Sequence, residues 1–168
     1  HCDAVNSVSP GPASYAYYGQ GVHALAHEQA FPEWMAEHRA KEAYDRFRQP
    51  TAYDHWQYLQ AARAYWTKYH DMSQRMHPGF ASAHGSVEAA TEAKMKHYTA
   101  HDPPVEQQQR EFMGRMIDAA RRQDVAALQQ LLATKPDGVD LDDCAEAAVE
   151  RQDQQAARLI LNIKYDVD

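Results

Sequence analysis

Residues 117–132 read IDAARRQDVAALQQLL, and residues 146–161 read EAAVERQDQQAARLIL. At an offset of 29 residues, both stretches carry the tripeptide Arg-Gln-Asp, an alanine three residues after its aspartate, and a final leucine. An aspartate side chain accepts hydrogen bonds from the first N–H groups of a helix, so Asp124 and Asp153 are expected to cap the second helix of each copy. An internal repeat of this kind predicts two helical hairpins stacked on one another over residues 103–168.

These two stretches resemble the paired helices of the ankyrin-repeat family, and the closing residues 166–168 (DVD) resemble the turn that ends such a repeat. The chain departs from the family pattern in two ways. Residues 143–146 (DCAE) stand near the place of the family's Thr-Pro-Leu-His tetrapeptide, and the spacing of 29 residues is shorter than the usual period of about 33. The resemblance implies a binding scaffold without chemistry of its own, in which the N-terminal helices cap the stack.

The composition is that of a globular protein with an acidic charge balance. The chain has 168 residues, 44% of them hydrophobic, with 17 Lys+Arg against 24 Asp+Glu and a formal net charge of −7. A nucleic-acid partner is not expected, because phosphate binding needs clustered Lys and Arg. No run of the sequence approaches the roughly 18 apolar residues of a transmembrane helix, so no membrane span is expected.

The dipeptide Pro103-Pro104 marks a boundary, because proline disfavours the helical conformation in the residue before it. All ten histidines and all three tryptophans precede this dipeptide. Residues 1–21, rich in Gly, Pro and Ser, predict an irregular arm, and residues 22–102 predict a His/Tyr/Trp-rich helical subdomain. Apolar residues recur at helical spacing, so the expected fold class is all-α, with this subdomain packed on the ankyrin-like hairpins.

Start and stop signals place helices within this subdomain. Pro32 suits a first helical turn, Thr51 with Asp54 resembles a capping box, and Ser86 is a candidate N-cap. The predicted helices cover residues 22–30, 32–49, 51–76 and 86–101.

Two histidine pairs suggest a metal site. His23 and His27 are four residues apart, as are His97 and His101, so each pair is expected on one face of its helix. Imidazole ligands would favour zinc or copper over magnesium or calcium. The alternative function is therefore a metal-binding helical domain, with hydrolysis as one option. Two other interpretations stay open: the histidines form ordinary hydrogen bonds, or they respond to acidification, because histidine gains charge between pH 7 and 5.

Two residue sets could face a protein partner. The first is aromatic and also suits core packing: Trp56, Tyr58, Tyr65 and Trp66. The second is acidic and would suit a basic partner: Asp140, Asp142 and Asp143, with Asp137, Glu146 and Glu150 near them. The favoured function is a protein–protein interaction module, such as a bacterial effector, inhibitor or immunity protein. Partner identity and oligomeric state are left open.

No motif predicts catalysis, because the chain has neither GxSxG nor a Gly-rich phosphate loop. No catalytic residue is assigned and no cofactor is expected, apart from the zinc or copper of the alternative. Cys2 and Cys144 are either two separate thiols or the disulfide of a secreted protein. Because the chain begins at His1, a trimmed or processed N-terminus is expected. The localisation is left open between the cytoplasm and secretion.

Overall fold

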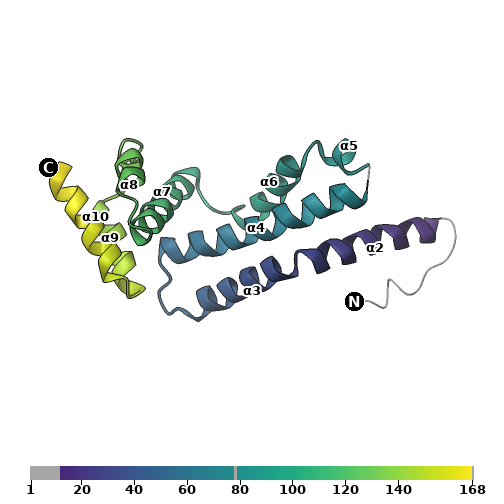
Figure 1. Cartoon of the computed structure of the whole chain (residues 1–168), viewed down its shortest axis with the longest axis horizontal. Coiled ribbons are helices and arrows are strands. Elements are labelled where there is room, and N and C mark those ends of the chain that lie inside the picture. Colours follow the sequence, from purple (N-terminus) through teal and green to yellow (C-terminus); the bar gives the residue numbers. More distant parts are fainter. Residues whose placement is uncertain (1–11, 78, 168) are drawn as a thin grey trace. The chain divides into compact units, whose positions relative to one another are not determined.

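The computed structural model describes residues 12–77 and 79–167, and the regular elements in these ranges are α-helices. In chain order they are α2 (Pro12–Gln29), α3 (Phe31–Arg46), α4 (Ala52–Met76), α5 (Phe80–His84), α6 (Val87–Tyr98), α7 (Pro104–Arg121), α8 (Val125–Leu132), α9 (Leu141–Glu150) and α10 (Gln154–Val167) (Figure 1). No strand occurs in the described ranges, which confirms the all-α prediction. None of these helices has the length and apolar character needed to cross a membrane.

The first helix begins earlier than the sequence predicts. Residues 1–11 of the predicted arm lie outside the described residues, but residues 12–21 form the first part of α2 instead of an irregular segment. Pro12 occupies the first helical position, where a backbone N–H would have no hydrogen-bond partner within the helix. Gly19 and Gly21 each cost a helix about 1 kcal/mol relative to alanine. That cost is small enough for the helix to extend through both glycines.

The chain forms two compact units. The N-terminal unit holds the described residues up to Glu42 together with Leu59–Ala100, and the C-terminal unit holds Ala43–Tyr58 together with the chain from His101 onward. The boundary near residue 101 lies close to the predicted one at Pro103. Helices α3 and α4 nevertheless contribute to both units, and no sequence signal predicted that sharing.

In the N-terminal unit, α2 and α3 are almost continuous. The N–H of Ala30 donates to the Ala26 carbonyl at 3.0 Å, and the N–H of Trp34 donates to the Ala30 carbonyl at 2.9 Å. The core of the unit combines apolar and aromatic side chains of α4 and α6, namely Leu59, Ala62, Met95, Trp66 and Tyr98.

In the C-terminal unit, the hairpins α7–α8 and α9–α10 pack on one another, with α10 against both α9 and α7 (Figure 1). All four helices contribute fully buried side chains to one core: Met116, Ile117, Leu128, Cys144 and Ile160. The first turns of α4 add Tyr53 to this core, with Trp56 packed against it.

The predicted N-caps within both units are confirmed. The N–H of Thr51 donates to Asp54 Oδ2 at 2.7 Å, and the N–H of Asp54 donates to Thr51 Oγ1 at 3.2 Å, which completes a reciprocal capping box. At the start of α6, the N–H of Ala89 donates to Ser86 Oγ at 3.0 Å. Each cap satisfies N–H groups that lack a partner within the helix.

The prediction that one helix carries both His97 and His101 is wrong. Helix α6 ends at Tyr98, and its C-cap residue Thr99 leaves the helical conformation with φ −116° and ψ 17°. The Thr99 hydroxyl turns back to the Met95 carbonyl at 3.4 Å. His101 therefore lies beyond the helix, and the spacing of four residues does not put the two imidazoles on one helical face.

The structure describes one of the two cysteines, Cys144. Cys2 lies outside the described residues, so its pairing stays a prediction. Cys144 is fully buried in α9. Burial, followed by the nearby Asp143 and Asp140 carboxylates, raises the pKa of the Cys144 thiol to about 12. The native thiol is accordingly protonated and poorly reactive.

Candidate functional site

The two Arg-Gln-Asp turns have the same backbone structure. The left-handed residues are Gln123 (φ 58°) and Gln152 (φ 62°), the middle residues of the two tripeptides. In each turn the aspartate N–H reaches the carbonyl five residues back at 2.9 Å, from Asp124 to Ala119 and from Asp153 to Ala148. This is the bond that defines a Schellman C-cap.

The aspartates of the same turns also cap the helices that follow. Asp124 Oδ1 accepts from the N–H of Ala127 at 3.0 Å, and Asp153 Oδ1 accepts from the N–H of Ala156 at 3.0 Å. Each tripeptide thus closes one helix and opens the next, as the repeat predicted.

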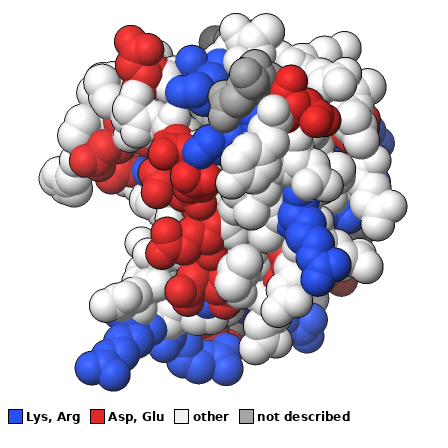
Figure 2. All heavy atoms as spheres, turned by 90° about the vertical axis from the view of Figure 1, so that its left-hand side faces the viewer, with Lys and Arg blue, Asp and Glu red and all other residues white. Residues whose placement is uncertain are grey.

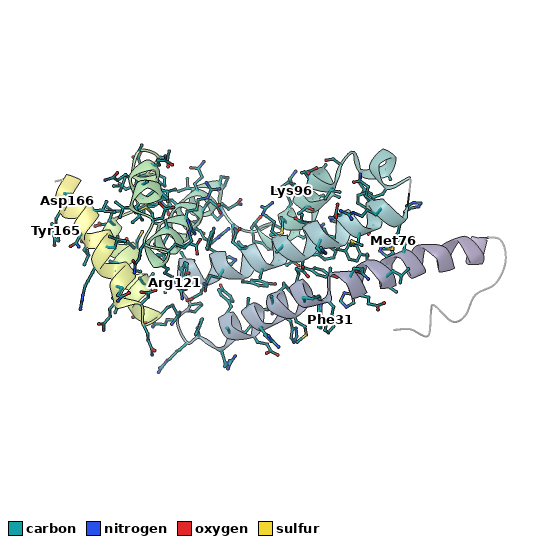
Figure 3. The ribbon with its side chains drawn as sticks, viewed as in Figure 1. Phe31, Met76, Lys96, Arg121, Tyr165 and Asp166 are labelled. Carbon is teal, nitrogen blue, oxygen red and sulfur yellow. The ribbon has the colours of Figure 1, made fainter. Side chains whose placement is uncertain are left out.

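An ion-pair network fixes these turns to the rest of the C-terminal unit. Arg121, at the end of α7, pairs with Asp153 at 3.1 Å and donates from Nη1 to the Tyr53 hydroxyl at 2.9 Å. Figure 3 labels Arg121 where the end of α7 meets the start of α4. Arg151 binds Asp54 and lies over the Phe47 ring at 3.7 Å from its centroid. The network therefore joins three segments that are far apart in the sequence.

Helix α9 presents an acidic face to solvent. Asp143, Glu146 and Glu150 are exposed at spacings of three and four residues, while the opposite face of α9 is buried in the core. Within the described residues, none of these three carboxylates forms an ion pair. Val149, half exposed, lies beside them. Figure 2, in which the C-terminal helices face the viewer, shows acidic side chains gathered in a column on this side of the molecule.

The other predicted acidic residues have partners within the unit. Asp140 caps α9 by accepting from the N–H of Asp142 at 3.0 Å, and Lys164 of α10 lies 2.8 Å from Asp142 and 3.5 Å from Asp140. The backbone hydrogen bond from Asp142, followed by the Lys164 charge, lowers the pKa of Asp140. Asp137 is exposed, and its carbonyl accepts from Gln109 at 3.1 Å.

A hollow of about 300 Å³ lies beside the acidic face, between the first turn of α4, helix α7, the turn before α9 and Asp143. Arg110, only 7% exposed, lines it and contacts Asp102 at 3.0 Å and His55 Nδ1 at 3.3 Å. Burial, followed by the Arg110 charge, lowers the pKa of His55. The neutral imidazole can therefore accept the Arg110 hydrogen bond.

The four predicted aromatic partner residues have contacts inside the fold. Trp56 donates to Glu111 at 3.0 Å, and Tyr58 stacks on Tyr44 with ring centroids 6.2 Å apart. In the N-terminal unit, Tyr65 is buried, and Trp66 donates from Nε1 to the Tyr98 hydroxyl at 2.9 Å. These contacts supply a structural role for each ring.

The predicted metal ligands bind tyrosines instead of one another. His27 Nδ1 lies 2.9 Å from the Tyr65 hydroxyl, and His23 Nδ1 makes the corresponding contact with Tyr69 one turn away. Burial raises the pKa of both phenols to about 12, so they stay protonated in these contacts.

The second predicted histidine pair is exposed: His97 lies on α6 and His101 beyond its end. Across residues 12–77 and 79–167, no three His, Cys, Asp or Glu side chains converge in a way that could hold a metal ion. Zinc or copper binding at these histidines stays a prediction without a described ligand cluster.

Sequence reasoning overlooked the arginines of the C-terminal unit. Arg151 and Arg121 order the turns, and Arg110 lines the hollow. One signal was present, because the repeat preserves the arginine of the tripeptide as well as its aspartate. Asp54, the partner of Arg151, and Tyr53, the partner of Arg121, lie in a distant segment that nothing in the sequence connects to the repeat.

No protein-family model, curated protein or solved structure matches this chain.

Proposed function

We propose that the C-terminal unit is a protein-binding scaffold of the ankyrin-like type, and that the acidic face of α9 takes a basic segment of a protein partner. The observation that carries the proposal is the unpaired exposure of Asp143, Glu146 and Glu150 on one face of a helix whose other face is core. Three carboxylates within two turns set up a negative potential that attracts Lys and Arg.

The rigidity of the unit supports this function. Two Schellman turns, two aspartate caps and the Arg151–Asp54 pair hold α9 in place before any partner arrives. A preorganised surface loses little conformational entropy on binding. Val149 provides an apolar contact point among the charges, so an amphipathic basic segment fits better than a purely polar one.

Peptide selection from a random display library on the folded protein tests the proposal. Selected peptides should be enriched in Lys and Arg, and their affinity should fall at least tenfold, about 1.4 kcal/mol, in the variant Asp143→Asn/Glu146→Gln/Glu150→Gln. Binding should also weaken as salt rises, because the contacts are between exposed charges.

A matched control variant distinguishes an effect of the α9 carboxylates from an effect of the net charge alone. The variant Glu28→Gln/Glu42→Gln/Glu88→Gln changes the net charge equally at exposed positions of the N-terminal unit and should keep affinity within about twofold, since surface charges far from a contact add little. Peptides without basic enrichment, or equal losses in both variants, would count against the proposal.

A further inference from the structure

His70 is the buried histidine of the N-terminal unit, with an exposed fraction of 6%. It lies on α4, and its Nδ1 is 3.0 Å from the hydroxyl of Thr91 on α6, which is buried as well. The imidazole stacks on Trp66 and touches Phe80 of α5, with ring centroids 5.7 Å away in both cases. Three helices therefore meet at one titratable side chain.

The charged groups that act on His70 would not stabilise a positive charge on its imidazole. His84 from α5, Lys94 from α6 and His23 from α2 act on the imidazole, and each disfavours a positive charge there. The carboxylates next in sequence to His70 and Thr91 are engaged elsewhere: Asp71 pairs with Arg75 at 3.2 Å, and Glu92 pairs with Arg63.

Tyr69, Trp66 and Ser73 of α4 carry no negative charge that could neutralise an imidazolium; Tyr69 meets His70 edge-on with ring centroids 5.7 Å apart, and burial raises the pKa of its phenol to about 12. The Trp66 ring also faces the Lys94 ammonium, 4.5 Å from the ring centroid, and an indole has no net charge. Ser73, one turn along α4, is buried, and its hydroxyl has no hydrogen-bond partner among the described residues. A hydroxyl carries no countercharge, so protonation would leave an uncompensated charge between the helices.

We propose that His70 is a pH-sensitive latch: as a neutral imidazole it holds α5 and α6 against α4, and on protonation it releases them. Release exposes the apolar side chains beneath α5 and α6, among them Phe80 and Met95. The latch belongs to the N-terminal unit and does not depend on the binding function of α9.

The direction of the response follows from the proton balance. Burial, followed by the cationic neighbours, lowers the pKa of His70 from 6.5 to about 4 in the closed form. The open form therefore binds a proton more tightly, and closure weakens as the pH falls from 6.5 toward 4. At pH 5 these two values give an opening constant about 30-fold higher than at pH 8.

Hydrogen exchange of the α6 amides at pH 8 and pH 5, corrected for the intrinsic pH dependence of exchange, measures this constant. The wild-type protein should open about 30-fold more at pH 5, and His70→Gln, which cannot take up a proton, should change less than threefold. His97→Gln is the matched control, because it removes an exposed histidine of α6 and should keep the full response.

An NMR titration of the wild-type imidazoles decides the matter even if His70→Gln does not fold. The His70 resonance should titrate near pH 4, together with the Trp66 indole signal that reports the stacked ring. Titration of His70 near 6.5, or an α6 opening constant equal at the two pH values, would overturn the latch.

Discussion

The Asp54 carboxylate receives two hydrogen bonds from the guanidinium of Arg151, 97 residues further along the chain: Nε reaches Oδ1 at 2.7 Å and Nη2 reaches Oδ2 at 2.6 Å. The same carboxylate accepts the N–H and the hydroxyl of Thr51 in the capping box of α4. Asp54 is almost completely buried, so one side chain joins α4 to the second repeat turn and also starts the helix that carries it.

Replacing Asp54 by Asn should lower the free energy of unfolding of the C-terminal unit by about 3–5 kcal/mol, because it leaves Arg151 without its countercharge. The repeat offers a matched control. Arg122 is the equivalent of Arg151, but it pairs with Asp118 at an exposed site, so Asp118→Asn should cost less than about 1 kcal/mol. Urea denaturation followed by Trp56 fluorescence measures both changes. Equal costs would show that the buried pair contributes no more than the exposed one.

The stabilising effect of Asp54 should disappear at low pH. Burial raises the pKa of this carboxyl, but the hydrogen bonds from Arg151 and Thr51 outweigh it, and the net pKa lies below 3.8. The contribution is therefore complete above pH 3.8 and is lost as the pH falls through the lower folded value. The stability difference between wild type and Asp54→Asn should stay constant above about pH 5 and shrink below about pH 4, as thermal melts across pH would show. A difference that shrank between pH 7 and 5 would contradict the assignment.

Glycine in place of Gln123 or Gln152 should stabilise the protein. Both glutamines have positive φ, a conformation that costs a side-chain-bearing residue about 1 kcal/mol and that glycine adopts freely. Each substitution is expected to raise the melting temperature by several degrees, and the two gains should add. Gln130→Gly, within α8, is the control and should destabilise by about 1 kcal/mol. A loss of stability at position 123 or 152 would mean that the glutamine side chain contributes more than its backbone costs.

Alanine at Gly114 should destabilise the C-terminal unit. A Cβ atom at this position would overlap the Trp56 indole, which lies directly on the glycine. Overpacking of this kind costs about 1–3 kcal/mol. The emission of Trp56 should shift at the same time, and adding Trp56→Leu should recover part of the stability by making room. If the Gly114→Ala variant has the melting temperature of the wild type and unchanged emission, the close approach of Trp56 to Gly114 is wrong.

Local features of the fold were readable from the sequence because each depends on residues that are neighbours along the chain. Thr51 with Asp54, Ser86, and the aspartates at 124 and 153 all cap helices where their patterns predicted. The spacing of 29 residues likewise anticipated two equivalent turns, and the structure adds that the glutamine of each turn has positive φ.

Long-range choices were not readable, because they depend on which segments the fold brings together. Arg151 and Arg122 occupy equivalent positions in the repeat, so the sequence pattern does not distinguish them. In the structure Arg151 pairs with the buried Asp54, whereas Arg122 pairs with Asp118 at the surface. His23 and His27 share a helical face as predicted, but Tyr69 and Tyr65 of α4 lie opposite and take their hydrogen bonds.

The sequence by itself therefore determined that the chain is helical, where most of its helices begin, and that its C-terminal part repeats. Backbone hydrogen bonding and capping act over four or five residues, so the information lies within each segment. Tertiary structure alone decided that residues 43–58 join the C-terminal unit, that His70 is buried among cationic neighbours, and that the carboxylates of α9 remain exposed. Burial and charge pairing arise only when distant segments pack, and no local pattern records them.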